Sequence, residues 1–337
     1  MNILKKILPS PLYNSLFKVY ISLKMRRDVK VAFRYDYKRY IKYSSSFGYD
    51  AASTNLIGKI IREYHVVEKG LTMHETKLGF GKAVVLSLIE DCIQFIRKYG
   101  DNDEQVKHAI EVVFEYGAYH KQYNFELDEK VTAAIGKLKE YLLPGDFKHQ
   151  REVTRDLYFQ DTKSSFDLFS KSRNSIRNFT NEEISIHKIE TVLQLAANAP
   201  SACNRQAWRT YIVEDKNKIS QILEIQGGNR GFGYLANKLI VIAADVSLFF
   251  GPHERNQVFV DGGIYAMNVL YALHYNSIGA CILNCSNSKE KDLRLRKACP
   301  LAESEVYIAM VVCGIPPDNF KIASSKRYSI NKTNNLL

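Results

Sequence analysis

Residues 171–208, KSRNSIRNFTNEEISIHKIETVLQLAANAPSACNRQAW, decide the fold of this chain. They contain two polar turns, joined by a segment whose apolar residues are spaced as in a helix. The first turn places Arg173, Ser175 and Arg177 within five residues. Two guanidinium groups and a hydroxyl at this spacing suit a phosphate group and the chain attached to it. We therefore interpret this turn as part of an anion-binding site.

The segment between the turns predicts a helix over residues 184–197, followed by a strand. Thr180 or Asn181 can cap the helix, and Glu182 and Glu183 are expected in its first turn. Its apolar residues recur at three- and four-residue steps: Ile184, Ile186, Ile189, Val192, Leu193 and Ala196. Pro200 ends it, and the second turn carries Ser201, Asn204 and Gln206. Residues 208–213, WRTYIV, have the aromatic and β-branched composition of a strand.

The two turns together, R-x-S-x-R-x-F at residues 173–179 and A-P-S-x-x-N-x-Q-x-W at residues 199–208, resemble the FMN-binding nitroreductase superfamily. The resemblance covers residues 168–330 and implies an α+β fold, in which a mixed sheet is flanked by helices. Strands are expected at 238–244, 279–284 and 306–313, and helices at 217–225, 261–275 and 288–298. The helix over 261–275 matches one that helps to form the family's dimer.

The resemblance also implies roles for particular residues. Arg173 and Ser175 match positions that hold the FMN phosphate and ribityl chain, and Arg177 matches a basic residue near the flavin N1 and O2 edge. Lys326 matches a second phosphate-binding position and has Arg327 beside it. A solvated basic tail is the alternative for Lys326 and Arg327.

Other matched positions would surround the flavin ring. Pro200, Ser201 and Asn204 match a loop that reaches the flavin of the other subunit, which implies a homodimer with shared flavin sites. Asn229 matches a polar contact to the ring, or is a turn former beside two glycines. The backbone of the segment containing Leu283, Asn284 and Cys285 would approach the flavin N5 atom.

The implied activity is that of an FMN-dependent oxidoreductase that passes hydride through flavin N5 to or from a small organic substrate. NAD(P)H would bind transiently as the electron donor. The chain departs from the family pattern at Ala207, Phe232, Asn284 and Cys285, so the substrate class stays open. The alternative is a non-catalytic flavin-binding or scaffold protein whose helical domain docks on a membrane or a partner.

The first half of the chain has helical periodicity and predicts an all-helical domain over residues 1–165, before an FMN-binding domain over 166–337. Helices are expected at 56–65, 82–99, 104–120 and 126–143, closed by Pro144-Gly145, with a polar linker over 146–163. His65, Glu68 and Lys69 lie in one segment, residues 65–82, in which Gly70 would end a helix. This segment would line the neighbouring active site, or form a helix end with a surface ion pair. It loosely resembles extensions of nitroreductase-like proteins of bacterial surface-glycan synthesis.

Residues 1–48 hold most of the net charge of +11, with eleven Lys or Arg against Asp28 and Asp36. Apolar residues at helical spacing give this basic segment an apolar stripe. We expect a helix that docks on its own protein, with peripheral contact to an anionic membrane as the alternative. No nucleic-acid-binding module is recognisable, so no nucleic-acid partner is expected.

The sequence has no apolar run long enough to span a bilayer, and it has no evident signal peptide. Both observations predict a cytoplasmic location, with peripheral membrane contact as the alternative for residues 1–48. The six cysteines have no zinc-like pairing, so we expect reduced thiols and no metal site. No catalytic side chain is expected beyond the flavin itself, because no Ser-His-Asp order or P-loop is present.

Overall fold

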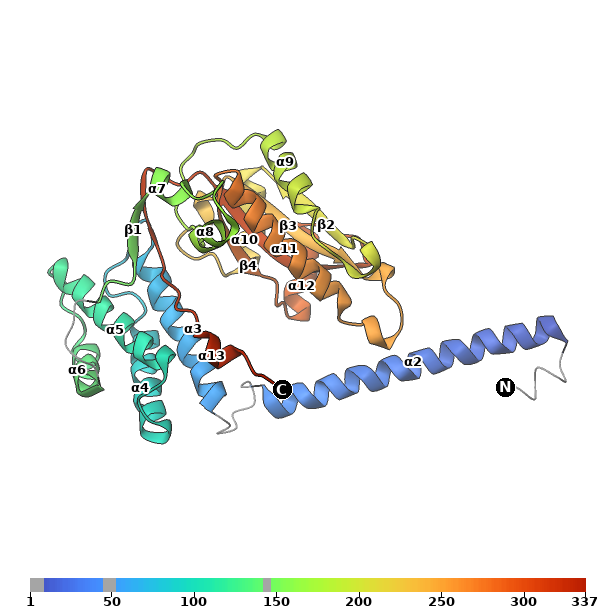
Figure 1. Cartoon of the computed structure of the whole chain (residues 1–337), viewed down its shortest axis with the longest axis horizontal. Helices are drawn as coiled ribbons and strands as arrows, with labels where there is room; N and C mark the ends of the chain where they lie inside the picture. Colours follow the sequence, from blue (N-terminus) through green and yellow to red (C-terminus); the bar gives the residue numbers. More distant parts are fainter. Residues whose placement is uncertain (1–8, 45–52, 142–146) are drawn as a thin grey trace.

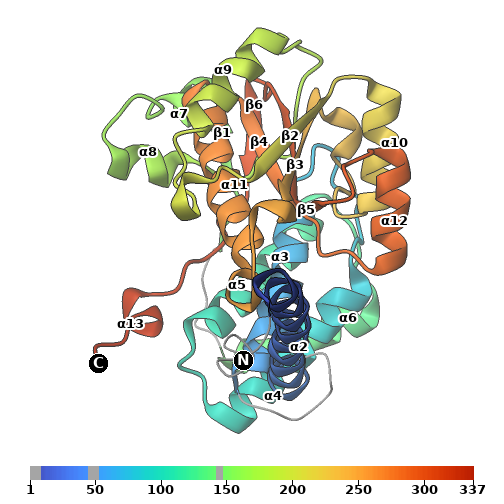
Figure 2. The same ribbon diagram turned by 90° about the vertical axis from the view of Figure 1, so that its right-hand side faces the viewer.

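In a computed structural model of the chain, residues 9–44, 53–141 and 147–337 are described. Figures 1 and 2 show a long N-terminal helix, a bundle of helices, and a body built on a sheet. The predicted fold class is confirmed: helices come first, and a mixed α+β core follows.

The bundle comprises α3 (Ser53–Leu71), α4 (Lys82–Tyr99), α5 (Glu104–Gln122) and α6 (Glu129–Leu138). It has an apolar core of its own, in which Ile60, Leu88 and Val113 are fully buried. Asp103 caps α5 by accepting hydrogen bonds from two backbone amides, as expected for a helix N-terminus. The four predicted helices are confirmed, although α6 ends at Leu138 rather than at Leu143. Pro144 and Gly145 lie outside the described residues.

The body contains a four-stranded antiparallel sheet in the order β2-β3-β5-β4, with bounds Trp208–Val213, Lys238–Asp245, Glu305–Gly314 and Gly279–Asn284 respectively. Alternate residues of β3 enter two separate cores: Leu239 and Val241 face one, and Ile240 and Ile242 the other. The first core is covered by α10 (Lys216–Gln226) and α12 (Lys289–Ala298), and the second by α9 (Ile186–Ala196) and α11 (Gln257–Tyr275). Both faces are therefore buried, which explains the continuous apolar sequence of this strand.

The predicted linker over 146–163 is wrong. Within it lie β1 (Arg151–Thr154) and α7 (Arg155–Phe159), which precede α8 (Phe166–Ser172). Strand β1 pairs antiparallel with β6 (Asn319–Ile322), from Arg151 opposite Ile322 to Thr154 opposite Asn319. The sequence of β1 is polar because this strand is largely exposed, so it has no apolar signature. The division at residue 165 stays a prediction.

The predicted start of the helix after the first turn is also wrong, because α9 begins at Ile186 and its cap is Ser185. Thr180 instead donates its hydroxyl and its backbone amide to the carbonyl of Ile315. Glu183 is drawn away from the helix by the buried Lys238 ammonium, at 3.1 Å. Glu214 lies 3.2 Å from the same ammonium, so the buried cation is held between two carboxylates, and this pairing outweighs the preference of Glu for a first helical turn.

The N-terminal helix α2 (Ser10–Tyr43) has no buried residue, so the expected docking on its own protein is limited to one place on the helix. Its described contact with the body is small and lies near Arg255, whose guanidinium pairs with Asp36 at 2.7 and 2.8 Å. Large apolar side chains are exposed along its length, from Leu12 to Tyr43. No helix in the described part of the chain is long and apolar enough to cross a membrane.

Candidate functional site

The first polar turn is an extended segment, and its geometry explains the R-x-S-x-R spacing. Successive side chains of an extended chain point to opposite sides. Ile176 is fully buried in the core beside β4, and its amide donates to the carbonyl of Ala280 at 2.9 Å. Arg173 and Ser175 consequently face away from the core, together with the guanidinium of Arg177, and all three line one cleft.

Two contacts hold this turn in place from the protein side. The hydroxyl of Tyr158 accepts a hydrogen bond from the Asn174 amide at 2.9 Å and donates one to the Asn174 carbonyl at 3.0 Å. One residue before Arg173, the Ser172 hydroxyl lies 2.7 Å from Nε2 of the buried His274 on α11. The position of the turn is therefore fixed by α7 and α11 before any ligand binds.

The cleft has a volume of about 650 Å³, within the range of small-molecule sites. Its walls come from parts of the chain that are far apart in sequence: α3, the start of β1, residues 170–177, β4 and the segment after β6. The C-terminal segment runs beside α3 (Figure 1). Its basic lining residues are His65, Arg151, Lys171, Arg173, Arg177, Lys326 and Arg327.

The electrostatics of the cleft favour an anion. Six of the lining residues are Lys or Arg, and none of the described residues that line it is Asp or Glu. Arg177 is 7% exposed, and its Nε atom is buried without a hydrogen-bond partner among the described residues. A buried, unpartnered donor is costly and calls for an acceptor from a ligand. The donor set therefore fits a phosphorylated cofactor such as FMN.

Lys69 of α3 adds a further positive charge close to Arg177. Burial lowers the pKa of the Lys69 ammonium, and the charges of Arg177 and Arg230 lower this pKa further. Like charges brought together at a half-buried position repel one another unless an anion neutralises them. Lys69 was one of three residues in the segment singled out from sequence.

Its neighbours His65 and Glu68 have separate positions. His65 lines the cleft, whereas Glu68 is fully buried behind it, 3.6 Å from His65 Nδ1. The alternative of a surface ion pair is wrong for Glu68. Helix α3 runs one residue past Gly70, to Leu71.

Of the residues predicted from sequence, Arg173, Ser175, Arg177, Lys326 and Arg327 meet in this one cleft. Asn229, Leu283 and Asn284 are not among its lining residues. The side-chain amide of Asn229 donates to the carbonyl of Leu223 at 2.5 Å, and the Asn229 carbonyl accepts from the amides of Phe232 and Gly233, as in a turn. The Leu283 side chain is buried in the core and the Asn284 side chain is exposed, and the approach of their backbone to flavin N5 stays a prediction. Between Cys281 and Leu283, Ile282 is the residue of β4 that lines the cleft.

The second polar turn lies outside this cleft. Pro200 and Asn204 are exposed and Ser201 is half-buried. Cys203, Asn204 and Gln206 all have left-handed backbone angles, with φ of 54°, 55° and 48°. Such conformations are rare outside glycine and persist only where surrounding contacts impose them. Here Asp261 of α11 accepts a hydrogen bond from the Ala202 amide at 3.1 Å, and Arg205 binds Glu254 through two nitrogens.

Sequence reasoning missed Arg151 and Lys171 as lining residues. Lys171 could have been predicted, because it lies two residues before Arg173 in the same basic turn. Arg151 could not have been predicted, because its position depends on the pairing of β1 with β6, and this pairing has no local sequence pattern.

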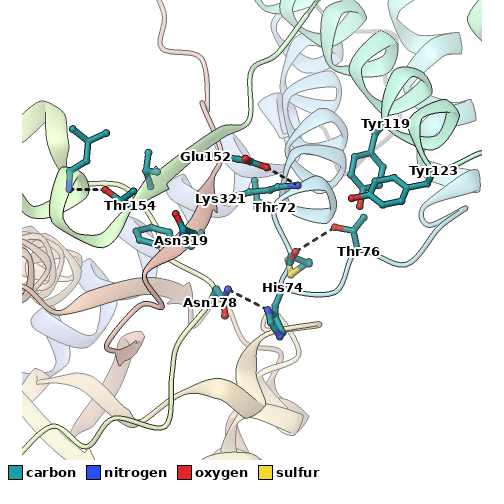
Figure 3. A pocket seen from close by; sticks show the side chains of 14 residues that line it. Thr72, His74, Thr76, Tyr119, Tyr123, Glu152, Thr154, Asn178, Asn319 and Lys321 are labelled. Atoms are coloured by element: carbon teal, nitrogen blue, oxygen red, sulfur yellow. Dashed lines mark hydrogen bonds and ion pairs between the residues drawn. The ribbon is translucent and has the colours of Figure 1, made fainter.

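A second cleft, of about 480 Å³, lies between α5, the β1–β6 pair and residues 72–76 (Figure 3). Tyr119 and Tyr123 form one wall, with ring centroids 4.9 Å apart. His74 Nδ1 lies 3.5 Å from the Asn178 amide nitrogen on the opposite side. Its one Lys, Lys321, is already near Glu152 at 3.6 Å. This lining is polar and aromatic, without the positive charge that phosphate binding requires.

Comparison with known proteins gives matches of one kind. A model of the nitroreductase family matches residues 170–315. The chain is 30% identical over 150 residues to a protein of Archaeoglobus fulgidus named "Putative NADH dehydrogenase/NAD(P)H nitroreductase", with 44% of this chain and 83% of that protein covered. A protein of the same name from Methanothermobacter thermautotrophicus is 24% identical over 152 residues, covering 44% of this chain and 76% of the relative.

Among solved structures, the chain is similar to an FMN-dependent nitroreductase from Clostridium difficile. The identity is 24%, the TM-score is 0.40, and the match covers 49% of this chain and 92% of the other.

Proposed function

The chain belongs to the nitroreductase family and is an oxidoreductase, and on this premise we propose that it uses FMN to transfer hydride to or from a small organic substrate. The observation that carries the proposal is the cleft in which Arg173, Arg177 and Lys326 converge without an acidic neighbour among the described lining residues. NAD(P)H is the proposed transient electron donor, in keeping with the names of the relatives.

The basic residues of the cleft divide into two groups by position. Arg173, Lys326 and Arg327 would bind the phosphate, with charge-assisted hydrogen bonds that are about twice as strong as neutral ones. Arg177 would lie at the N1 and O2 edge of the ring, the position that its match to the family pattern implies. Bound FMN supplies hydride transfer through its N5 atom. A fixed cation near the ring edge favours the reduced state, because reduction adds negative charge there.

The cleft carries more positive charge than one phosphate group neutralises. Arg151 and Lys171 add to the residues assigned above. We propose that the surplus receives a substrate with its own negative charge. The loose resemblance of residues 65–82 to extensions in surface-glycan synthesis suggests that class of metabolism as its source.

We further propose a homodimer with shared flavin sites. Val260, Ile264 and Met267 are exposed at helical spacing on α11, on the side away from the sheet. Their apolar area suits a partner helix. The loop that contains Pro200, Ser201 and Asn204 is hydrogen-bonded to Asp261 of the same helix. If α11 lies at the subunit interface, this loop lies there too, and it would reach the flavin of the other subunit.

The experiment is purification of the full chain, identification of any released flavin, and anaerobic titration with NADH and NADPH. We expect a yellow protein with one FMN per chain, bleached by at least one nicotinamide. A colourless protein that takes up no FMN at micromolar concentration refutes the proposal.

A second candidate is a flavin-binding scaffold without catalysis, favoured by the exposure of α2. Fourteen large apolar or aromatic side chains of this helix are exposed, interleaved with Lys and Arg. Such a surface suits peripheral binding to anionic lipid. FMN that binds but is reduced by neither nicotinamide, together with salt-sensitive co-sedimentation with anionic vesicles, would support this candidate.

A further inference from the structure

A cluster of imidazole and carboxylate groups lies in the helical bundle, away from the residues proposed to bind FMN. It comprises His108 and Glu111 on α5 and His149 in the segment before β1. One ligand atom from each residue lies within 4.8 Å of the other two. His108 is 3% exposed, and the side chains of His149 and Glu111 are 24% and 27% exposed. The cluster is therefore anchored in the core and open to solvent on one side.

We propose that His108, Glu111 and His149 bind one divalent transition-metal ion of the Zn²⁺ type. Two imidazoles and one carboxylate form a donor set that binds zinc in proteins. Zn²⁺ bonds of about 2.0–2.1 Å in a tetrahedral arrangement place ligand atoms about 3.3 Å apart. Here Glu111 Oε2 lies 2.9 Å from His149 Nε2 and 4.0 Å from His108 Nδ1.

The contact between His149 and Glu111 does not have the geometry of a hydrogen bond. Nε2 of His149 is buried and has no hydrogen-bond partner among the described residues, although Glu111 Oε2 is only 2.9 Å away. Two ligands that point at a common ion, rather than at each other, produce this combination. An ordinary ion pair would align the donor with the acceptor.

Glu68 orients the first ligand. Its Oε1 atom lies 2.9 Å from Nε2 of His108, at a fully buried position. Because a carboxylate can only accept, we assign the hydrogen of His108 to Nε2, which leaves the lone pair of Nδ1 free toward Glu111. A carboxylate behind a metal-binding histidine is a common arrangement in metal sites, and it fixes both the tautomer and the ring orientation. The Tyr64 ring packs at right angles to the His108 ring, with ring centroids 5.0 Å apart, and restricts the imidazole further.

Segment 147–150 lies along α5 and brings the third ligand into position. Phe147 packs near Phe114, and Gln150 donates from its backbone and its side chain to Glu115, at 3.1 and 3.3 Å. His149 lies between these two contacts. Because Arg151 follows two residues later and lines the anion cleft, an ion here would also fix one cleft residue.

Metal binding should be measured on the full chain, stripped of metal, with Zn²⁺ as the probe. A Cys203→Ser background removes the exposed thiol, which could bind Zn²⁺ on its own. We expect one Zn²⁺ per chain and a raised midpoint of thermal unfolding, with no effect of Mg²⁺. Co²⁺ in place of Zn²⁺ should give visible d–d bands without a thiolate charge-transfer band.

The variants are His149→Ala and Glu111→Gln, each of which should lower Zn²⁺ affinity at least tenfold. Glu111→Gln keeps the side-chain volume, so it remains informative if His149→Ala folds poorly. The matched control is His187→Ala, which removes an exposed histidine that pairs with Glu190 at the same i,i+3 spacing but has no third ligand among the described residues. Less than half a Zn²⁺ per chain, or equal affinity in both cluster variants and the control, overturns the proposal. The result does not depend on whether FMN binds.

Discussion

His274 connects the folding of α11 to the turn that carries Arg173, and its protonation should destabilise the protein. The Ser172 hydroxyl uses its one hydrogen to donate to the Phe169 carbonyl at 2.9 Å, so we assign the Nε2 hydrogen of His274 as the donor to Ser172. Nδ1 is then a buried atom without a hydrogen-bond partner among the described residues. A proton added there would be a buried charge near Arg173. Burial, with a smaller contribution from the Arg173 charge, lowers the pKa of His274 to about 4.

The sign and size of the effect follow from proton linkage. The unfolded chain, with a histidine pKa near 6.5, binds more protons than the folded chain between pH 6.5 and pH 4. The free energy of unfolding therefore has its full value above pH 6.5 and falls as the pH is lowered through this interval. The loss is about 2 kcal/mol at pH 5 and about 3 kcal/mol when the titration is complete.

Urea unfolding at pH 8, 7, 6 and 5 tests this expectation. The single tryptophan, Trp208, reports on the core, since its ring stacks on Tyr265 of α11 at 4.6 Å. In His274→Phe, a neutral ring replaces the imidazole among Tyr158, Phe159 and Phe169. This variant should lose the Ser172 hydrogen bond at every pH, but it should lack the additional loss between pH 8 and pH 5.

The difference between wild type and variant isolates His274 from other groups that titrate in the same range. His187→Ala is the control, because its exposed side chain should leave the wild-type slope unchanged. If wild type and His274→Phe lose the same free energy of unfolding between pH 8 and pH 5, the buried neutral imidazole is not the cause and the reasoning is wrong.

Three further predictions concern the cleft and α2. Arg173→Gln should weaken FMN binding by roughly 10- to 100-fold, because it removes a charge-assisted hydrogen bond to the phosphate. Flavin fluorescence titration measures the affinity, with Arg155→Gln as a control outside the cleft. An unchanged affinity would show that Arg173 does not bind FMN. Lys69→Met should stabilise the FMN-free protein against urea, because it removes the repulsion between Lys69 and Arg177. It should also weaken FMN binding, because it removes the attraction of Lys69 for the anion. A loss of stability in the FMN-free variant would contradict this prediction. Asp36→Asn should speed proteolysis within α2, because Asp36 forms the ion pair with Arg255 that joins this helix to the body. The midpoint of thermal unfolding of the body should not change. Equal cleavage rates in wild type and variant would show that another contact holds the helix.

Much of the fold was predictable because its signals are local. Helix α4 and strand β4 have the bounds that were predicted, since apolar periodicity and flanking Gly or Asn mark both. The five basic and hydroxyl residues that meet in the cleft were identified from the family pattern rather than from the chemistry of single residues. A basic tail such as Lys326-Arg327 has no local feature that distinguishes a phosphate site from a solvated end.

The features that were missed depend on contacts between distant residues. Strand β1 is polar and exposed, and its partner lies at residues 319–322. Its pairing brings Arg151 to the cleft and His149 to α5, so one unrecognised strand concealed two of the positions proposed above to bind ligands. Similarly, Glu183 was expected in a helix because the demand of Lys238 for a carboxylate cannot be read from a window of sequence.

The helical bundle is part of the site rather than an attachment to it. Helix α3 contributes His65 to the wall of the cleft and Lys69 to the charge around Arg177, and its buried Glu68 links this wall to His108 on α5. Lys69 costs stability when no ligand is present, because its half-buried ammonium lies near the like charge of Arg177. Packing against the sheet alone does not require a half-buried lysine at this position. We therefore expect the first half of the chain to take part in ligand binding at the cleft, and substrate selection is the property that we propose for it.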